Sequence, residues 1–151
     1  MERLTNRNKD GGENMPLKNY TTKVPALQTV GEIQGILAVH GARKIMLDYT
    51  EDGRVDSVSF AVETPVGLKG FVLPARVDAV AAALAKQHVK CDYEHAERVA
   101  WHIVKDWIDA QMAFIESEQA AMDEVFLPYM RDNAGTTLYQ AFLKNQLLLE
   151  G

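Results

Sequence analysis

The stretch that decides the fold of this 151-residue chain runs from Tyr93 to Met130 and reads YEHAERVAWHIVKDWIDAQMAFIESEQAAMDEVFLPYM. It contains no glycine, and no proline before Pro128, and its apolar residues recur every three to four positions. This period is typical of an amphipathic α-helix. We therefore predict one long helix over residues 94–127. At 1.5 Å per residue it would be roughly 50 Å long, longer than so small a domain is wide, so something else must cover part of it.

Three segments that precede this helix have the alternating pattern and turn signals of β-strands. They span residues 44–50, 55–63 and 68–73. An Asp-Gly pair separates the first two segments, and a Thr-Pro-Val-Gly run separates the second from the third. Such pairs and runs favour tight turns between antiparallel strands. The pattern predicts a three-stranded antiparallel sheet with one apolar face.

Helices are expected to flank the strands, because a sheet with one apolar face needs a cover. The predicted segments are residues 30–40, 76–87 and 136–149. Thr29 and Glu32 have the spacing of a capping box at the start of the first helix. In the last helix we expect Leu138 and Phe142 to face inward. The predicted fold is α+β, with the order α-β-β-β-α-α(long)-α in a single domain over residues 15–151.

Residues 1–14 are polar and lack apolar periodicity. The codons of residues 9–15 can include GGAGGA just upstream of Met15, which would make Met15 the initiator and residues 1–14 a translated leader. The alternative is an ordinary disordered tail, since chain termini are often loose. Either way we exclude residues 1–14 from the fold.

Composition limits the classes of function. The chain is 47% hydrophobic and 25% charged, which is typical of one globular domain. Its formal net charge of -5 disfavours a protein that binds mainly by neutralising phosphates, and favours a protein partner. The single cysteine cannot form an internal disulfide and suits a reducing cytosol. Because no long apolar run is present, we expect no membrane association and a cytoplasmic location.

The predicted long helix carries a cationic stripe on one side. Its members step by three and four residues: His95, Arg98, His102 and Lys105. This spacing places them on the same helix face, where they could contact phosphates or an acidic partner. The alternative is a solvated face of alternating charge, which is the commoner role of such patterns. We predict this stripe as the nucleic-acid or partner-binding site, with protein contact favoured over a weak nucleic-acid contact.

The apolar arc of the same helix is wider than a helix needs to pack on one sheet. In one interpretation the strands and the last helix wrap the arc as ordinary core. In the other, two copies of the chain pair along their long helices as a homodimer. The residues that such an interface would bury are Trp101, Phe114, Phe126 and Tyr129.

Signals for catalysis and metal binding are weak. His88, Cys91 and His95 form an H-x2-C-x3-H pattern, but a structural zinc site normally takes four ligands. No P-loop, G-x-G-x-x-G, G-x-S-x-G or H-E-x-x-H motif is present. We therefore predict no catalytic residues, no metal site and no cofactor, and a protein that is not an enzyme.

The chain from about residue 18 to 140 resembles a family of small uncharacterised proteins encoded by phages and prophages of Gram-positive bacteria. The residues that carry the resemblance are Arg98, Trp101, Lys105, Trp107, Gln111 and the ending Phe126-Leu127-Pro128-Tyr129. Genes of this family tend to lie among phage accessory and replication genes. His102 stands where many relatives would have arginine, which weakens the cationic stripe.

The resemblance implies two alternative functions in the cytoplasm of a bacterial host. The first is a non-enzymatic accessory protein of phage DNA metabolism, acting through protein contacts or a weak nucleic-acid contact at Arg98, His102 and Lys105. The second is an inhibitor of a host defence system, such as an anti-CRISPR protein. Its negative charge would let it occupy the basic nucleic-acid channel of a nuclease.

Overall fold

The computed structural model describes residues 16–145. The predicted leader, residues 1–14, lies outside this range. In chain order the elements are α2 (Ala26–Val39), β1 (Lys44–Tyr49), β2 (Val55–Thr64), β3 (Gly67–Pro74), α3 (Val77–Lys86), α4 (Tyr93–Glu116), α5 (Met122–Val125), the 3-10 helix η1 (Leu127–Tyr129), β4 (Met130–Arg131) and α6 (Leu138–Lys144). The α+β class is confirmed. The sheet has four antiparallel strands in the order β1-β2-β3-β4, so the prediction of three was wrong by one.

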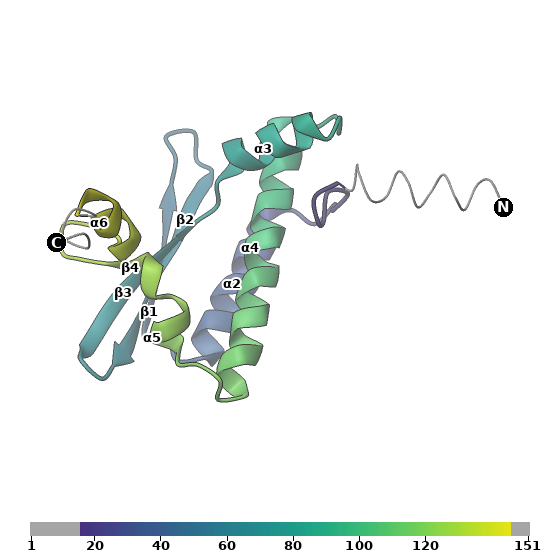
Figure 1. Ribbon diagram of the computed structural model, residues 1–151. Helices are drawn as coiled ribbons and strands as arrows, with labels where there is room; N and C mark the ends of the chain where they lie inside the picture. Colours follow the sequence, from purple (N-terminus) through teal and green to yellow (C-terminus); the bar gives the residue numbers. More distant parts are fainter. Residues whose placement is uncertain (1–15, 146–151) are drawn as a thin grey trace.

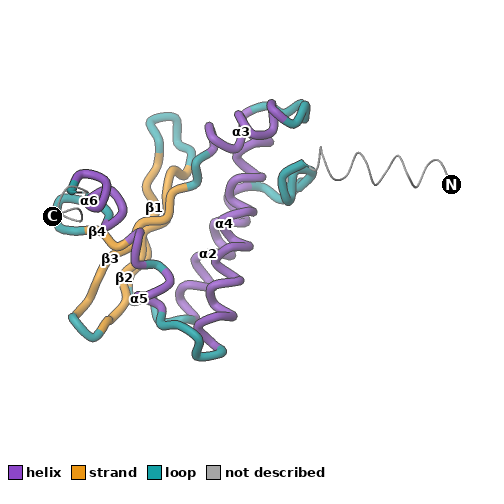
Figure 2. The backbone as a smooth tube through the Cα atoms, in the orientation of Figure 1, coloured by secondary structure: helices purple, strands orange, loops and turns teal. Residues whose placement is uncertain are grey.

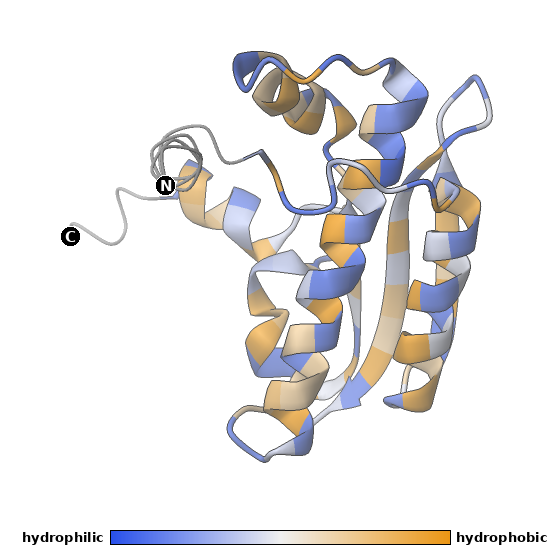
Figure 3. Ribbon diagram, turned by 90° about the vertical axis from the view of Figure 1, so that its right-hand side faces the viewer, coloured by the Kyte–Doolittle hydropathy of each residue, from blue (hydrophilic) through white to orange (hydrophobic). Residues whose placement is uncertain are grey.

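The helices are arranged on two sides of the sheet (Figure 1). α2 and α4 pack against each other and cover one face, and α3 packs against α4. The tube view in Figure 2 shows α6 on the other side of the sheet from α2 and α4. In Figure 3 orange apolar segments alternate with blue polar ones along the helices, as expected for helices with one buried side. No helix within residues 16–145 is long and apolar enough to cross a membrane.

The strand boundaries follow the predicted pattern closely, because turn glycines set them. Gly53 and Gly67 adopt φ angles of +84° and +110°, which favour glycine in the two hairpin turns. The β1–β2 register shifts beside Asp48, where Tyr49 pairs with Val55. Asp56 is therefore an extra residue, a β-bulge, and it lets Val55 join the buried side of the sheet while Asp56 stays exposed.

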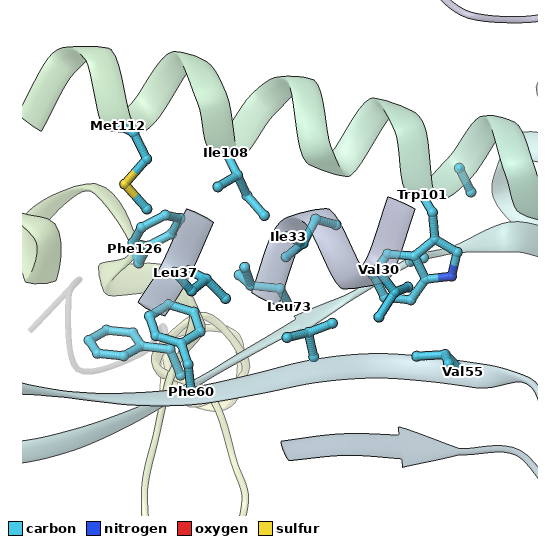
Figure 4. Packing of buried hydrophobic residues seen from close by; sticks show 14 of the residues in the cluster. Val30, Ile33, Leu37, Val55, Phe60, Leu73, Trp101, Ile108, Met112 and Phe126 are labelled. Atoms are coloured by element: carbon cyan, nitrogen blue, oxygen red, sulfur yellow. The ribbon is translucent and has the colours of Figure 1, made fainter. Parts of the chain in front are cut away.

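The core lies between the sheet and the α2–α4 layer. In Figure 4, Ile108 and Met112 point from α4 toward the sheet, where Phe60 and Phe126 lie close together. Phe60 stacks on Phe71 with ring centroids 5.2 Å apart and meets Phe126 edge-on at 5.4 Å. Burying each such ring contributes about 1.5–3 kcal/mol, so this aromatic group is a main source of stability.

The long helix is shorter than predicted. α4 ends at Glu116 after 24 residues, not at residue 127. Glu118 has a left-handed φ of 63°, and the Gln119 amide donates back to the Phe114 carbonyl, which closes the helix. The chain then turns toward the sheet, so that Phe126 is fully buried in the core. A straight helix to residue 127 would carry Phe126 away from Phe60, and the packing of this ring favours the break.

The start of α2 also differs from the prediction. The helix begins at Ala26, directly after Pro25, and Thr29 lies inside it, fully buried. The Thr29 hydroxyl donates to the Pro25 carbonyl at 3.4 Å instead of capping the helix. The predicted capping box is therefore wrong, and Glu32 serves a different partner, described below.

The end of the described chain departs from the prediction in two ways. β4, which no sequence pattern indicated, pairs Met130 with Phe71 and Arg131 with Gly70. α6 is described over Leu138–Lys144, and the rest of the predicted helix to residue 149 extends outside the described residues. Leu138 and Phe142 were expected to face inward, but they are 45% and 48% exposed. α6 lies away from the main core, which is already filled by α2, α4 and Phe126.

Candidate functional site

The predicted stripe of α4 lies against the segment Pro16–Pro25, which we call the N-terminal arm. The Leu17 amide donates to the Gln87 side chain at 2.7 Å, just after α3. The Asn19 side chain donates to Asp106 of α4 at 2.7 Å, and the Lys18 ammonium lies 3.2 Å from the same carboxylate. These polar contacts join the arm to α4 and to the residue that follows α3.

Three of the four stripe residues contact the arm. The His95 ring contacts the Tyr20 carbonyl through Nε2. Arg98 Nε donates to the Thr22 carbonyl at 3.4 Å. The Thr22 hydroxyl lies 3.3 Å from His102 Nδ1. These three side chains therefore do lie on one side of α4, as their spacing predicts, but that side is covered by the chain itself.

The remaining charges of the stripe are also neutralised within the chain. Lys105 lies 3.3 Å from Glu32 of α2, and its side chain is 22% exposed. Arg98 lies 3.8 Å from Glu94 with its side chain 21% exposed. Partial burial opposes ionisation of Asp106, but the hydrogen bond from Asn19 and the nearby lysine outweigh burial and hold its pKa below the ordinary value. A nucleic acid or partner at this stripe would have to displace the arm.

The four predicted interface aromatics have different environments. Trp101 and Phe126 are fully buried by their own chain, so neither offers surface to a second copy. Tyr129 is partly buried and packs edge-on against Trp107, with ring centroids 5.4 Å apart. Phe114 is 43% exposed. The buried pair is therefore core, and of the four only Phe114 is classed as exposed.

A buried ion pair, which the sequence pattern did not indicate, joins the β1–β2 hairpin to α4. Glu97 is only 7% exposed, and Arg54 Nη1 donates to its carboxylate at 2.8 Å. The Arg54 guanidinium also lies 4.9 Å from the centre of the Tyr93 ring and 3.5 Å from Asp52. Burial and the nearby carboxylates of Asp78 and Glu97 raise the pKa of Tyr93. The cluster anchors a turn to a helix, which is a structural role.

A second missed contact links α2 to the end of α4. His40 Nε2 lies 2.7 Å from the Glu116 carboxylate, and Nδ1 lies 2.8 Å from the Ile36 carbonyl. Both ring nitrogens can donate only when the imidazole is protonated. The bond to the Ile36 carbonyl, followed by the bond to Glu116, therefore raises the pKa of His40.

α6 presents an apolar surface that no part of residues 16–145 covers fully. Its four large apolar side chains, which we call the α6 cluster, are 45–53% exposed: Leu138, Tyr139, Phe142 and Leu143. Thr137 caps the helix and forms a reciprocal capping box with Gln140, so the helix start is well specified. An isolated helix of seven residues is marginal in water, and its main packing within the chain is against η1.

The face of the sheet opposite α2 and α4, which we call the open face, has a floor of small residues. Across the strands the outward rows are Lys44–Ala61–Gly70–Arg131, Met46–Ser59–Val72 and Asp48–Ser57–Pro74. Arg131 lies over Gly70, where an added Cβ would come within 3.4 Å of Arg131 Nε. Glycine at position 70 therefore leaves room for the guanidinium over the sheet.

Two grooves lie on this face. The first, of about 640 Å³, is lined by Lys44, Arg131 and Asp132 among others. Lys69 also borders it, but its side chain is on the opposite face of the sheet, because it pairs with buried Val62. The second, of about 370 Å³, runs past Ser57 and Val72 to Arg76 and Tyr139. Gly135 lines both grooves, so the two are adjacent. Sequence reasoning missed this surface, because its residues come from four strands, the 132–137 turn and α6.

The described residues contain no group of three or more His, Cys, Asp or Glu side chains arranged to hold a metal ion. His88, Cys91 and His95 do not form such a group in residues 16–145.

Comparison of the chain with protein-family models, curated proteins and solved structures found no match. The resemblance to phage and prophage proteins therefore stays a prediction from the residues that carry it.

Proposed function

We propose that this chain is a non-enzymatic accessory protein that acts by binding another protein through the α6 cluster. The observation that carries the proposal is the exposure of four large apolar side chains, 45–53% each, on one seven-residue helix. Single exposed apolar residues are common on protein surfaces, but adjacent ones in a patch are typical of an interaction site. Aromatic side chains such as Tyr139 and Phe142 are enriched in interfaces.

The α6 cluster is a better candidate for the binding surface than the α4 stripe. Arg98, His102 and Lys105 already have partners in the arm, in α4 or in α2. The α6 side chains have no comparable cover from residues 16–145. Binding at α6 would also stabilise a helix that is too short to be stable alone, which couples partner binding to local order.

The biological setting of the proposal comes from the sequence resemblance. A phage accessory protein of this kind would act in phage DNA metabolism by recruiting or modulating a protein of that process. Contact through an apolar helix face requires no catalytic group on this chain.

The test is affinity capture from phage-infected or lysogenic cells followed by mass spectrometry. The variant Phe142→Asp/Leu143→Asp places two charges in the α6 cluster. The matched control Val39→Asp/Val66→Asp places the same charges at isolated apolar positions that are 82% and 76% exposed. We expect the wild type and the control to capture the same partner and the α6 variant to lose it.

Light scattering on the wild type, the control and the α6 variant tests whether the partner is a second copy of the chain. If it is, the wild type and the control should have the mass of a dimer and the α6 variant the mass of a monomer. Capture of the same proteins by all three forms would contradict the proposal, as would a monomeric wild type that captures no partner.

A further inference from the structure

The second groove of the open face lies directly beside the α6 cluster. It holds about 370 Å³, a volume in the range of ligand-binding pockets. Its floor comes from β2 and β3, through Ser57, Val72 and Pro74, and α6 contributes Tyr139 and Gln140. A partner bound to the α6 cluster therefore also borders this groove, because Tyr139 belongs to both.

Two walls of the second groove are held in place by their neighbours. Tyr129 of η1 lines the groove, and its ring packs edge-on against Trp107 with ring centroids 5.4 Å apart. At α6 the Gln140 amide donates to the Thr137 hydroxyl at 3.2 Å, and the Thr137 amide donates to the Gln140 side chain at 2.9 Å. A groove whose walls are already fixed needs little ordering when a ligand enters, which favours binding.

Two opposite charges line the second groove without pairing. Asp56 and Arg76 are close in the fold, because the Ala75 amide donates to the Asp56 carbonyl at 3.3 Å. Both residues are exposed, and neither side chain forms a salt bridge among residues 16–145. A ligand with one positive and one negative group could therefore pair with both side chains, and this pairing would fix its orientation.

A peptide segment with an aromatic side chain matches these features best. Val72, Pro74 and Pro128 give the groove apolar walls beside its tyrosine rings. Tryptophan and tyrosine are the commonest anchors of protein interfaces, and they insert into well-packed pockets. An arginine anchor fits less well, because Arg76 lines the same groove. An acidic residue on one side of the aromatic anchor would pair with Arg76, and a basic residue on the other side would pair with Asp56.

We propose that the protein partner of the α6 cluster binds through a peptide segment whose aromatic side chain enters the second groove, between an acidic residue that pairs with Arg76 and a basic residue that pairs with Asp56. This inference rests on the proposed function and names the chemistry of the partner at the same site. The α6 cluster supplies apolar contact area, and the second groove selects the segment that fits.

The test is selection of a random peptide library, displayed on yeast, with the full chain as bait, followed by fluorescence anisotropy of the enriched peptides. We expect these peptides to share a tryptophan or tyrosine with an acidic residue on one side and a basic residue on the other. Replacing the aromatic residue of the peptide by alanine should weaken binding at least about 30-fold, as expected for an interface hot spot.

Variants of the chain test whether the peptide lies in the groove. Val72→Trp fills the groove and should weaken binding at least about tenfold. The matched control Val66→Trp, at a hairpin position that is 76% exposed, should bind within about twofold of the wild type. Nuclear Overhauser contacts between the peptide ring and the Val72 methyl groups of the wild type give a second readout, which does not depend on the folding of Val72→Trp.

A charge exchange tests the orientation of the peptide. Asp56→Lys/Arg76→Glu keeps the net charge and should weaken binding of the enriched peptides at least about fivefold, because like charges replace opposite ones. A peptide whose acidic and basic residues are exchanged should bind this variant better than it binds the wild type. The matched control Asp109→Lys/Lys90→Glu makes the same exchange at two exposed positions outside the groove, and it should bind within about twofold of the wild type.

Enrichment of no peptide, or of peptides without an aromatic residue, would overturn the inference, as would equal binding to Val72→Trp and to the wild type. The capture experiment separates the inference from the proposed function. If Val72→Trp retains the captured partner and Phe142→Asp/Leu143→Asp loses it, the partner binds α6 without the groove, and only the inference fails. If both variants retain the partner, the proposed function fails and the inference fails with it.

Discussion

Substituting Arg54 with methionine removes the guanidinium that neutralises the Glu97 carboxylate. The side chain of Glu97 is only 9% exposed, so the variant leaves a nearly buried charge without a partner. Removing one member of a fully buried pair costs about 3–5 kcal/mol. The Arg54 side chain is 35% exposed, and water can partly replace it, so we expect about 2–3 kcal/mol, which includes the lost contact with the Tyr93 ring.

A thermal melt followed by tryptophan fluorescence measures this loss, because Trp101 is fully buried in the core. For a protein of about 150 residues, 2–3 kcal/mol corresponds to a fall in Tm of about 5–10 °C. The matched control is Arg43→Met, which removes an exposed arginine that has no salt bridge within residues 16–145. It should change stability by less than about 0.5 kcal/mol.

A double-mutant cycle with Glu97→Met tests the cause of the effect. If Arg54→Met destabilises by leaving Glu97 unpaired, the double variant should be more stable than Arg54→Met alone, because both partners are then apolar. Additive losses in the cycle, or a loss no larger than that of the control, would refute the role given to this pair.

Three further predictions concern His40, Phe126 and Thr137. The raised pKa of His40 means that the His40–Glu116 contact stabilises the fold below about pH 6.5, and that this stabilisation is lost as the pH rises through the folded-state pKa. Because the Glu116 side chain is 65% exposed, the free energies of unfolding of wild type and Glu116→Gln, measured by urea titration, should differ by only about 0.5 kcal/mol at pH 5.5 and converge by pH 8.5. Phe126→Ala should cost about 3–5 kcal/mol by chemical denaturation, because the ring is fully buried against Phe60, and a loss below 1 kcal/mol would contradict its place in the core. Thr137→Ala removes the cap of α6 and should weaken that helix by about 1 kcal/mol, seen as faster amide hydrogen exchange in α6 without a change in the global urea midpoint; an equal loss in the global midpoint would mean that α6 folds with the core.

The parts of the fold that the sequence predicted correctly are those determined by the pattern of neighbouring residues. Alternation and turn glycines located β1, β2 and β3 to within about a residue at each end, because register and turn geometry follow from neighbouring residues. The end of α4 was missed because Ser117–Ala121 contains no glycine or proline, and the break depends on Phe126 reaching Phe60. β4, with two residues, is too short to show any alternation.

The candidate sites were harder to predict than the fold, because they depend on contacts between distant parts of the chain. The spacing of His95, Arg98 and His102 placed them on one side of α4, yet their contacts come from arm residues 75–80 positions earlier in the chain. The open face joins residues from position 44 to position 139, and no local motif contains them. The spacing of residues in the sequence indicates which side chains lie on the same side of a helix or strand, but not which distant segments of the chain cover them.

The N-terminal arm also affects the order in which the molecule is assembled on the ribosome. The contacts of Asn19 with Asp106 and of Leu17 with Gln87 span 87 and 70 residues, so the first part of the described chain to be synthesised must wait for α3 and α4 before it can dock. The β1–β2–β3 meander can form much earlier from neighbouring segments. Docking of the arm is therefore a late step of translation, and a tag fused ahead of it would remain beside an undocked segment until α4 has emerged.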